Sequence, residues 1–132
     1  MKYDSSYDPP APVIRVRIVN LATPNHQIRD IPALIDSGAD MSVVPSRLAR
    51  TIALVPKGIV EVQGYRIERV ERRPKYFVRI EFDRHTVELS VVGDECSEVL
   101  LGRDFLRHFV LRLDGPRQEF TVEPGRSSRN SE

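Results

Sequence analysis

The stretch ALIDSGADMS, residues 33–42, decides the fold of this chain. Three apolar residues, 33–35, lead directly into Asp36, Ser37 and Gly38. An apolar strand that ends in a carboxylate, a hydroxyl and a glycine delivers an acid into a partly buried turn. Gly38 has no Cβ, so another backbone can approach it closely. Asp-Ser-Gly alone is a common turn sequence, so the flanking residues must decide between a turn and a site.

A second unusual segment, VLLGRDFL at residues 99–106, lies downstream. It also begins with an apolar run, which is followed by Gly102 and by the charged residues Arg103 and Asp104. Turns between surface strands rarely need such apolar flanks. The two segments together therefore favour a functional site over an ordinary turn.

The rest of the chain shows the two-residue alternation of half-buried strands, at residues 14–18, 78–82 and 87–91. A further alternating segment with the turn sequence Asp-Gly-Pro predicts a C-terminal hairpin over 109–122. Helical signals are sparse and predict two short helices, over 45–50 and 102–108. The pattern indicates a small, mostly β domain.

The composition argues against several classes of function. The chain has 132 residues, of which 40% are hydrophobic and 30% charged, and this fits one globular domain. Twenty Lys and Arg against nineteen Asp and Glu give a net charge of +1, which argues against nucleic acid or an anionic membrane as partner. The arginine-rich segment 66–73 also contains acids, which favours a solvated face over an RNA-binding stripe. No apolar stretch is long enough to span a bilayer.

The expected compartment is the cytosol, because the single cysteine, Cys96, forms no intrachain disulfide and no signal peptide opens the sequence. The expected domain spans residues 13–122. Residues 1–12 and 123–132 are rich in Pro, Ser and charged residues without any period, and they are expected to be disordered N-terminal and C-terminal tails.

Other chemistries are weaker candidates. Cys96 lies in the acidic segment 93–98, which would raise the pKa of its thiol, so a plain free thiol is favoured over a nucleophile. His26, His85 and His108 are scattered without the spacing of metal ligands. We expect neither a metal nor a cofactor.

On its two motifs the sequence resembles the retropepsin-like aspartic proteases, the single-lobe family typified by retroviral and retrotransposon proteases and their cellular relatives. The motifs are residues 34–42 and 100–104, and a strand-rich stretch separates them as it does in that family. The similarity covers approximately residues 13–122. It implies an all-β fold, a retropepsin-like closed β-barrel that forms one acid-protease lobe, with one or two short helices and a dimeric assembly.

The resemblance also implies roles for the first motif. Asp36 takes the place of the catalytic aspartate of an aspartic endopeptidase. The rest of the loop takes the place of the family's substrate-binding residues, which here are Ser37, Gly38, Ala39 and Asp40.

In the second motif, the resemblance makes Gly102, Arg103 and Asp104 structural supports of the active site. It implies that Arg103 forms a buried pair with Asp40. Without the resemblance, the same charges would be read as an exposed ion pair on a helix, worth at most about 1 kcal/mol.

The family's flap, a β-hairpin that closes over substrate, is expected between residues 59 and 82. Its substrate contacts are expected at the tip, from Gln63, Gly64 and Tyr65. The sequence departs from the glycine-rich flaps of viral proteases, because this segment holds one glycine and a charged run over 68–75. Both a moving lid and a plain solvated hairpin remain open.

Peptide hydrolysis by this chemistry needs two carboxyls that share one proton, and the chain contains one Asp-Ser-Gly. The only other Asp-Gly, at residues 114–115, lies in a polar turn. The second carboxyl must therefore come from Asp36 of a symmetric partner, which predicts a homodimer that acts on a peptide or protein substrate. The alternative is a retropepsin-fold dimer that cleaves weakly or not at all and serves as a peptide-binding or assembly module.

Four apolar residues near the motifs can either line specificity pockets or pack in the core; they are Ile35, Val44, Val62 and Leu101.

Overall fold

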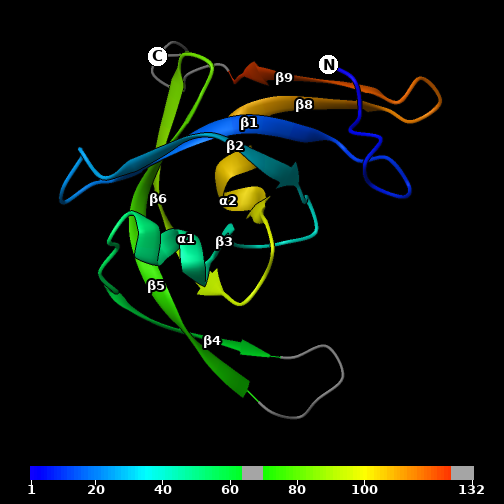
Figure 1. Ribbon diagram of the computed structural model, residues 1–132. Coiled ribbons are helices and arrows are strands. Elements are labelled where there is room, and N and C mark those ends of the chain that lie inside the picture. The colour runs from blue at the N-terminus through cyan, green and yellow to red at the C-terminus, as the bar shows by residue number, and fades with distance from the viewer. Residues whose placement is uncertain (64–69, 126–132) are drawn as a thin grey trace, which may run out of the picture.

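The computed structural model describes residues 1–63 and 70–125, and Figure 1 shows the order of the elements. Two short helices interrupt a succession of strands. The elements are β1 (Val13–Asn20), β2 (Gln27–Ile35), β3 (Val43–Pro45), α1 (Ser46–Thr51), β4 (Gly58–Gln63), β5 (Val70–Phe82), β6 (His85–Asp94), β7 (Val99–Leu101), α2 (Arg103–Leu106), β8 (Phe109–Asp114) and β9 (Glu119–Pro124).

Six of the strands close into a barrel. Their order is β1-β2-β7-β3-β6-β5, and β5 pairs back onto β1 so that Arg17 lies opposite Glu81 and Asn20 opposite Val78. β4 pairs with the outer part of β5 and forms a hairpin that extends from the barrel, while β8 and β9 form a separate two-stranded sheet. The predicted retropepsin-like closed barrel is confirmed.

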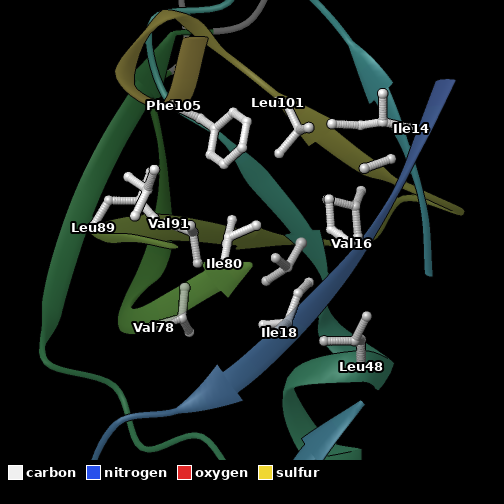
Figure 2. Packing of buried hydrophobic residues seen from close by; sticks show 14 of the residues in the cluster. Ile14, Val16, Ile18, Leu48, Val78, Ile80, Leu89, Val91, Leu101 and Phe105 are labelled. Atoms are coloured by element: carbon white, nitrogen blue, oxygen red, sulfur yellow. The ribbon is translucent and has the colours of Figure 1, made fainter. Parts of the chain in front are cut away.

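The barrel interior is built from the alternating apolar residues that the sequence shows. Figure 2 shows side chains of β1, β5 and β6 pointing toward one another, among them Ile18, Ile80 and Val91. These three side chains have no measurable exposure, and Phe105 of α2 is equally buried at one end of the core. Each fully buried aliphatic or aromatic side chain contributes about 1.5–3 kcal/mol relative to an exposed one, so this cluster is the main source of stability.

The two predicted helices form, with different lengths. α1 covers almost the expected residues, whereas α2 ends at Leu106 instead of reaching His108. After Leu106 the His108 N–H still donates to the Phe105 carbonyl at 3.2 Å, and the His108 carbonyl accepts from the Gly125 N–H at 2.9 Å, where the C-terminal hairpin begins. Among the described residues, neither helix has the length and hydropathy that crossing a membrane requires.

The chain ends differ from the expected tails. In residues 1–12, Met1 exchanges backbone hydrogen bonds with Phe120, and the ring of Tyr3 packs on that of Phe120 at 5.9 Å between centroids. Composition misses this because the contact depends on a strand more than a hundred residues away. At the other end, β9 continues to Pro124, two residues beyond the expected domain boundary, and residues 126–132 lie outside the described residues.

Candidate active site

Asp36 lies where β2 leaves the barrel. β2 runs parallel to β7 with Ile35 opposite Leu101, and the Asp36 N–H extends this ladder by donating to the Leu101 carbonyl at 2.9 Å. The chain then turns: the Gly38 N–H donates to Asp36 Oδ1 at 3.1 Å and the Ala39 N–H donates to the Asp36 carbonyl at 3.1 Å. Such turns are favoured by Asp, because its side chain accepts a hydrogen bond from the backbone two residues on. Asp36 is therefore held, as a partly buried residue, at the end of β2.

An exposed link joins this turn to α2. Arg103 donates to the Ser37 carbonyl at 2.8 Å through Nη1, and its Nη2 pairs with Asp40. The expected Arg103–Asp40 pair thus forms, but the expectation that it is buried is wrong for this chain. The two side chains are 56% and 84% exposed.

A buried link joins the other end of the same loop to α2. The Asp104 carboxylate accepts the Ser42 N–H at 2.9 Å, the Ser42 hydroxyl at 2.7 Å and the Phe105 N–H at 2.8 Å. The Ser42 hydroxyl in turn accepts the Gly102 N–H at 3.0 Å, and Ser42 is completely buried. Sequence reasoning missed Ser42 as a site residue, although a small polar residue between Met41 and Val43 is a usable signal, since buried polar groups need partners.

Gly102 is the point of closest approach between loop and helix. A Cβ there would lie 2.8 Å from the Ala39 carbonyl oxygen and 2.9 Å from the carbonyl carbon and oxygen of Met41. Backbone atoms cannot yield as a flexible side chain can, so only glycine fits this position. The Arg103 N–H donates to the same Ala39 carbonyl at 2.8 Å.

A cavity of about 440 Å³ lies between this loop and β4. Its wall is mixed, with apolar side chains from four segments and acids among them. The lining residues are Gly38, Asp40, Met41, Val43, Val60, Glu61, Val62, Val92 and Asp94.

Of the four apolar residues considered for pocket walls, Val62 lines this cavity, whereas Ile35, Val44 and Leu101 are buried in the core. The contribution of Val92 was missed because it depends on β3 and β6 lying side by side, with Val43 opposite Val92.

The predicted flap hairpin exists as β4 and β5, which pair antiparallel from Gly58 opposite Lys75 to Gln63 opposite Val70. Gln63 is thus the last residue of β4. The other two expected contacts at the tip, Gly64 and Tyr65, lie outside the described residues. The hairpin is tied to the barrel by Arg73, whose Nε donates to Asp94 at 2.9 Å.

Cys96 and the histidines form no second centre. Burial raises the pKa of the Cys96 thiol, and the nearby charges of Asp94 and Glu98 raise it further, as the acidic segment predicts. Within residues 1–63 and 70–125, no group of three His, Cys, Asp or Glu side chains has the arrangement of a metal site.

The closed barrel, with an Asp-Ser-Gly turn braced by a Gly-Arg-Asp helix start, places the chain in the class of single-lobe acid-protease folds. A sequence profile of the family described as "gag-polyprotein putative aspartyl protease" matches residues 22–108, more than half of the chain. The chain belongs to this family of gag-type aspartyl proteases. No curated protein sequence matches the chain.

Solved structures agree with this fold. The EIAV protease, solved with an inhibitor, shares 19% identity with a TM-score of 0.54, over 74% of this chain and 86% of its own. The protease of a simian foamy virus (mac) shares 18% identity with a TM-score of 0.54, over 73% and 92%. A retropepsin-like aspartic protease from Rickettsia conorii shares 11% identity with a TM-score of 0.61, over 89% and 84%. These identities are low, so the likeness is one of fold.

Proposed function

We propose that this protein is an aspartic endopeptidase in which Asp36 from each of two identical chains forms the catalytic pair. The observation that carries the proposal is the intact Asp36-Ser37-Gly38 turn, set at the end of a strand whose residues Ala33 and Ile35 are buried, beside a cavity large enough for peptide side chains. Membership of an aspartyl protease family supports it.

The mechanism follows from two carboxyls that share one proton. A water molecule held between the two Asp36 side chains loses a proton to the ionised carboxylate as its oxygen attacks the scissile carbonyl carbon. The neutral carboxyl hydrogen-bonds to the carbonyl oxygen, where negative charge develops. The pair then passes a proton to the leaving nitrogen as the C–N bond breaks. Neither a covalent acyl-enzyme nor a cofactor takes part.

The substrate is expected to lie between the 36–42 loop and β4. Ser37, Gly38, Ala39 and Asp40 would contact it from the loop, and Gln63, Gly64 and Tyr65 from the hairpin. The cavity supports this path, because Gly38 and Asp40 line one wall and Val60 and Val62 line the other. Gly102, Arg103 and Asp104 would act by holding the loop in place, as their contacts with Ala39, Ser37 and Ser42 suggest.

Two features support assembly with a second copy. In Figure 1 the 36–42 loop, the free end of β4 and the β8–β9 turn all lie on the same side of the barrel. β8 pairs only with β9 among the described residues, and Val110 and Leu113 of β8 are 51% and 49% exposed. A second chain related by a two-fold axis beside Asp36 would bring the second carboxyl, and docking on one face of β8 would cover one of these two side chains, which point to opposite faces of the strand.

The test is cleavage of a denatured protein by wild type and by Asp36→Asn, over a series of enzyme concentrations. Asp36→Asn keeps the shape of the side chain but cannot supply the ionised carboxylate, so we expect a loss of at least about 10²-fold in rate. The matched control is Asp83→Asn, an exposed turn position with φ of 56°, which asparagine also tolerates.

Specific activity should rise with enzyme concentration as dimer forms, and it should be highest at mildly acidic pH, where the pair holds one proton. Equal cleavage by wild type and Asp36→Asn would refute the proposal, as would an active monomer in sedimentation. A dimer without any cleavage would instead support the alternative of a peptide-binding or assembly module.

A further inference from the structure

Residues 1–12 fold into a compact segment, which we call the strap. Asp4 and Ala11 exchange backbone hydrogen bonds at 2.7 and 3.2 Å, so the segment doubles back on itself. The Asp4 carboxylate closes the turn by accepting the Ser6 N–H at 2.9 Å and the Ser6 hydroxyl at 2.6 Å. Figure 1 shows the strap beside the β8–β9 hairpin, before β1 begins.

The strap is anchored at two distant places. At its start, the Tyr3 N–H donates to the Gln118 carbonyl at 2.8 Å, next to the Met1 contacts with Phe120. In its middle, the Tyr7 hydroxyl donates to the Glu98 carboxylate, which is 91 positions away in the sequence. The strap therefore connects the C-terminal hairpin to the segment that joins β6 to β7.

That segment, the 95–98 loop, borders the candidate active site. It follows directly on Asp94, which lines the cavity and holds Arg73, and the Glu95 N–H donates to the Asp94 carboxylate at 2.7 Å. It ends at β7, the strand beside β2 that leads to Asp36. A displacement of this loop would therefore move the cavity wall at Asp94.

Few contacts hold the 95–98 loop. Glu95 and Ser97 are exposed, and the loop buries little apolar surface. Apart from Tyr7, the loop is held by Arg47 of α1, whose Nη2 donates to the Ser97 carbonyl at 3.1 Å, and by the Cys96 thiol, which donates to the Glu98 carbonyl at 3.3 Å. Segments with so few buried contacts open readily, so one additional hydrogen bond changes their order substantially.

We propose that Tyr7 is a positioning residue, whose hydroxyl acts through Glu98 to hold the 95–98 loop and thereby the Asp94 wall of the cavity. Its effect on catalysis rests on the proposed proteolytic function, but its effect on the loop does not. The hydrogen bond to Glu98 also raises the pKa of Tyr7 to about 12. The hydroxyl therefore keeps its proton, and can donate, at any pH near neutrality or below.

The experiment compares Tyr7→Phe, which removes only the hydroxyl, with Tyr3→Phe. Tyr3 is the matched control because it lies on the same strap, packs its ring on Phe120, and makes no hydroxyl hydrogen bond within the described residues. Amide hydrogen exchange of the 95–98 loop should be about 3- to 10-fold faster in Tyr7→Phe, the range expected for one net hydrogen bond, and unchanged in Tyr3→Phe.

In cleavage assays, Tyr7→Phe should raise KM by a similar factor, about 3- to 10-fold, while kcat stays unchanged, because the cavity wall and not the Asp36 turn is disturbed. Glu98→Gln keeps an oxygen that accepts from Tyr7 and should behave as wild type. Glu98→Ala should match Tyr7→Phe, and the double variant should add nothing further.

Equal exchange in wild type, Tyr7→Phe and Tyr3→Phe would overturn the proposal. Faster exchange with an unchanged KM would also overturn it, because Tyr7 would then order the loop without positioning the cavity wall. A wild-type protein that cleaves nothing would refute the proposed function, and the exchange measurement would still decide whether Tyr7 holds the loop.

Discussion

The two ends of the 36–42 loop are fixed to α2 in opposite ways. At one end Arg103 reaches Asp40 and the Ser37 carbonyl across the surface, with both charged side chains more than half exposed. At the other end Ser42, with no exposed surface, shares its amide and hydroxyl with the Asp104 carboxylate. One link is an ion pair in water and the other is a hydrogen-bonded group in the protein interior.

The buried Ser42–Asp104 link and the exposed Arg103–Asp40 pair should therefore contribute differently, the first to stability and the second to the chemistry of the cavity. Exposed ion pairs contribute about 0–1 kcal/mol, because water screens the charges and long side chains lose freedom. A buried donor left without its acceptor costs about 1–3 kcal/mol. The Ser42 end should therefore hold the loop to the barrel, whereas Asp40, which lines the cavity, is available to act on a ligand.

Asp104→Ala should have the largest effect on stability. It removes the acceptor of three hydrogen bonds, two of them from the completely buried Ser42. We expect the free energy of unfolding in urea to fall by about 2–4 kcal/mol, from the loss of more than one buried hydrogen bond. Asp114→Ala is the control, because its carboxylate accepts the Arg117 N–H in an exposed turn. If both variants lose the same small amount, the Ser42 link does not hold the loop.

Gly102→Ala should have the next largest effect. The added methyl group would meet backbone atoms of Ala39 and Met41 at 2.8–2.9 Å, so loop and helix must separate. Such overpacking costs about 1–3 kcal/mol. Gly115→Ala is the matched control, since no atom lies within 4 Å of the Cβ that it would add. Equal midpoints of thermal unfolding for the two variants would contradict the close approach at Gly102.

Much of the fold could be predicted because its signals are local. Alternation with a period of two identifies β1, β5 and β6, and the turn sequence after Asp114 identifies the last hairpin. The contact between residues 1–12 and β9 could not be predicted, because it depends on where a distant strand lies.

In the candidate site, too, residues in sequence motifs could be predicted, whereas residues brought together by the fold could not. Asp36, Gly102 and Asp104 lie in two contiguous motifs, so a resemblance to known sequences can indicate them. Val92 and Asp94 line the cavity because β3 and β6 are neighbours in the barrel, which no spacing in the sequence reveals. Arg103 pairs with Asp40 yet stays exposed, because a sequence motif indicates a pairing without its burial.

Arg103→Gln should have the smallest effect on stability and therefore gives the sharpest contrast with Asp104→Ala. The glutamine keeps a donor for the Ser37 carbonyl but removes the charge that pairs with Asp40. We expect the free energy of unfolding to fall by less than about 1 kcal/mol. The difference from wild type should shrink further in 1 M salt, because salt screens interactions between solvent-exposed charges. Urea unfolding at low and high salt measures both values.

A loss of unfolding free energy as large as that of Asp104→Ala, and unaffected by salt, would mean that the exposed pair, and not the Ser42 link alone, stabilises the loop. A small, salt-sensitive loss of stability together with a changed KM would mean that Arg103, through its pair with Asp40, acts on ligand binding in the cavity and not on the stability of the loop.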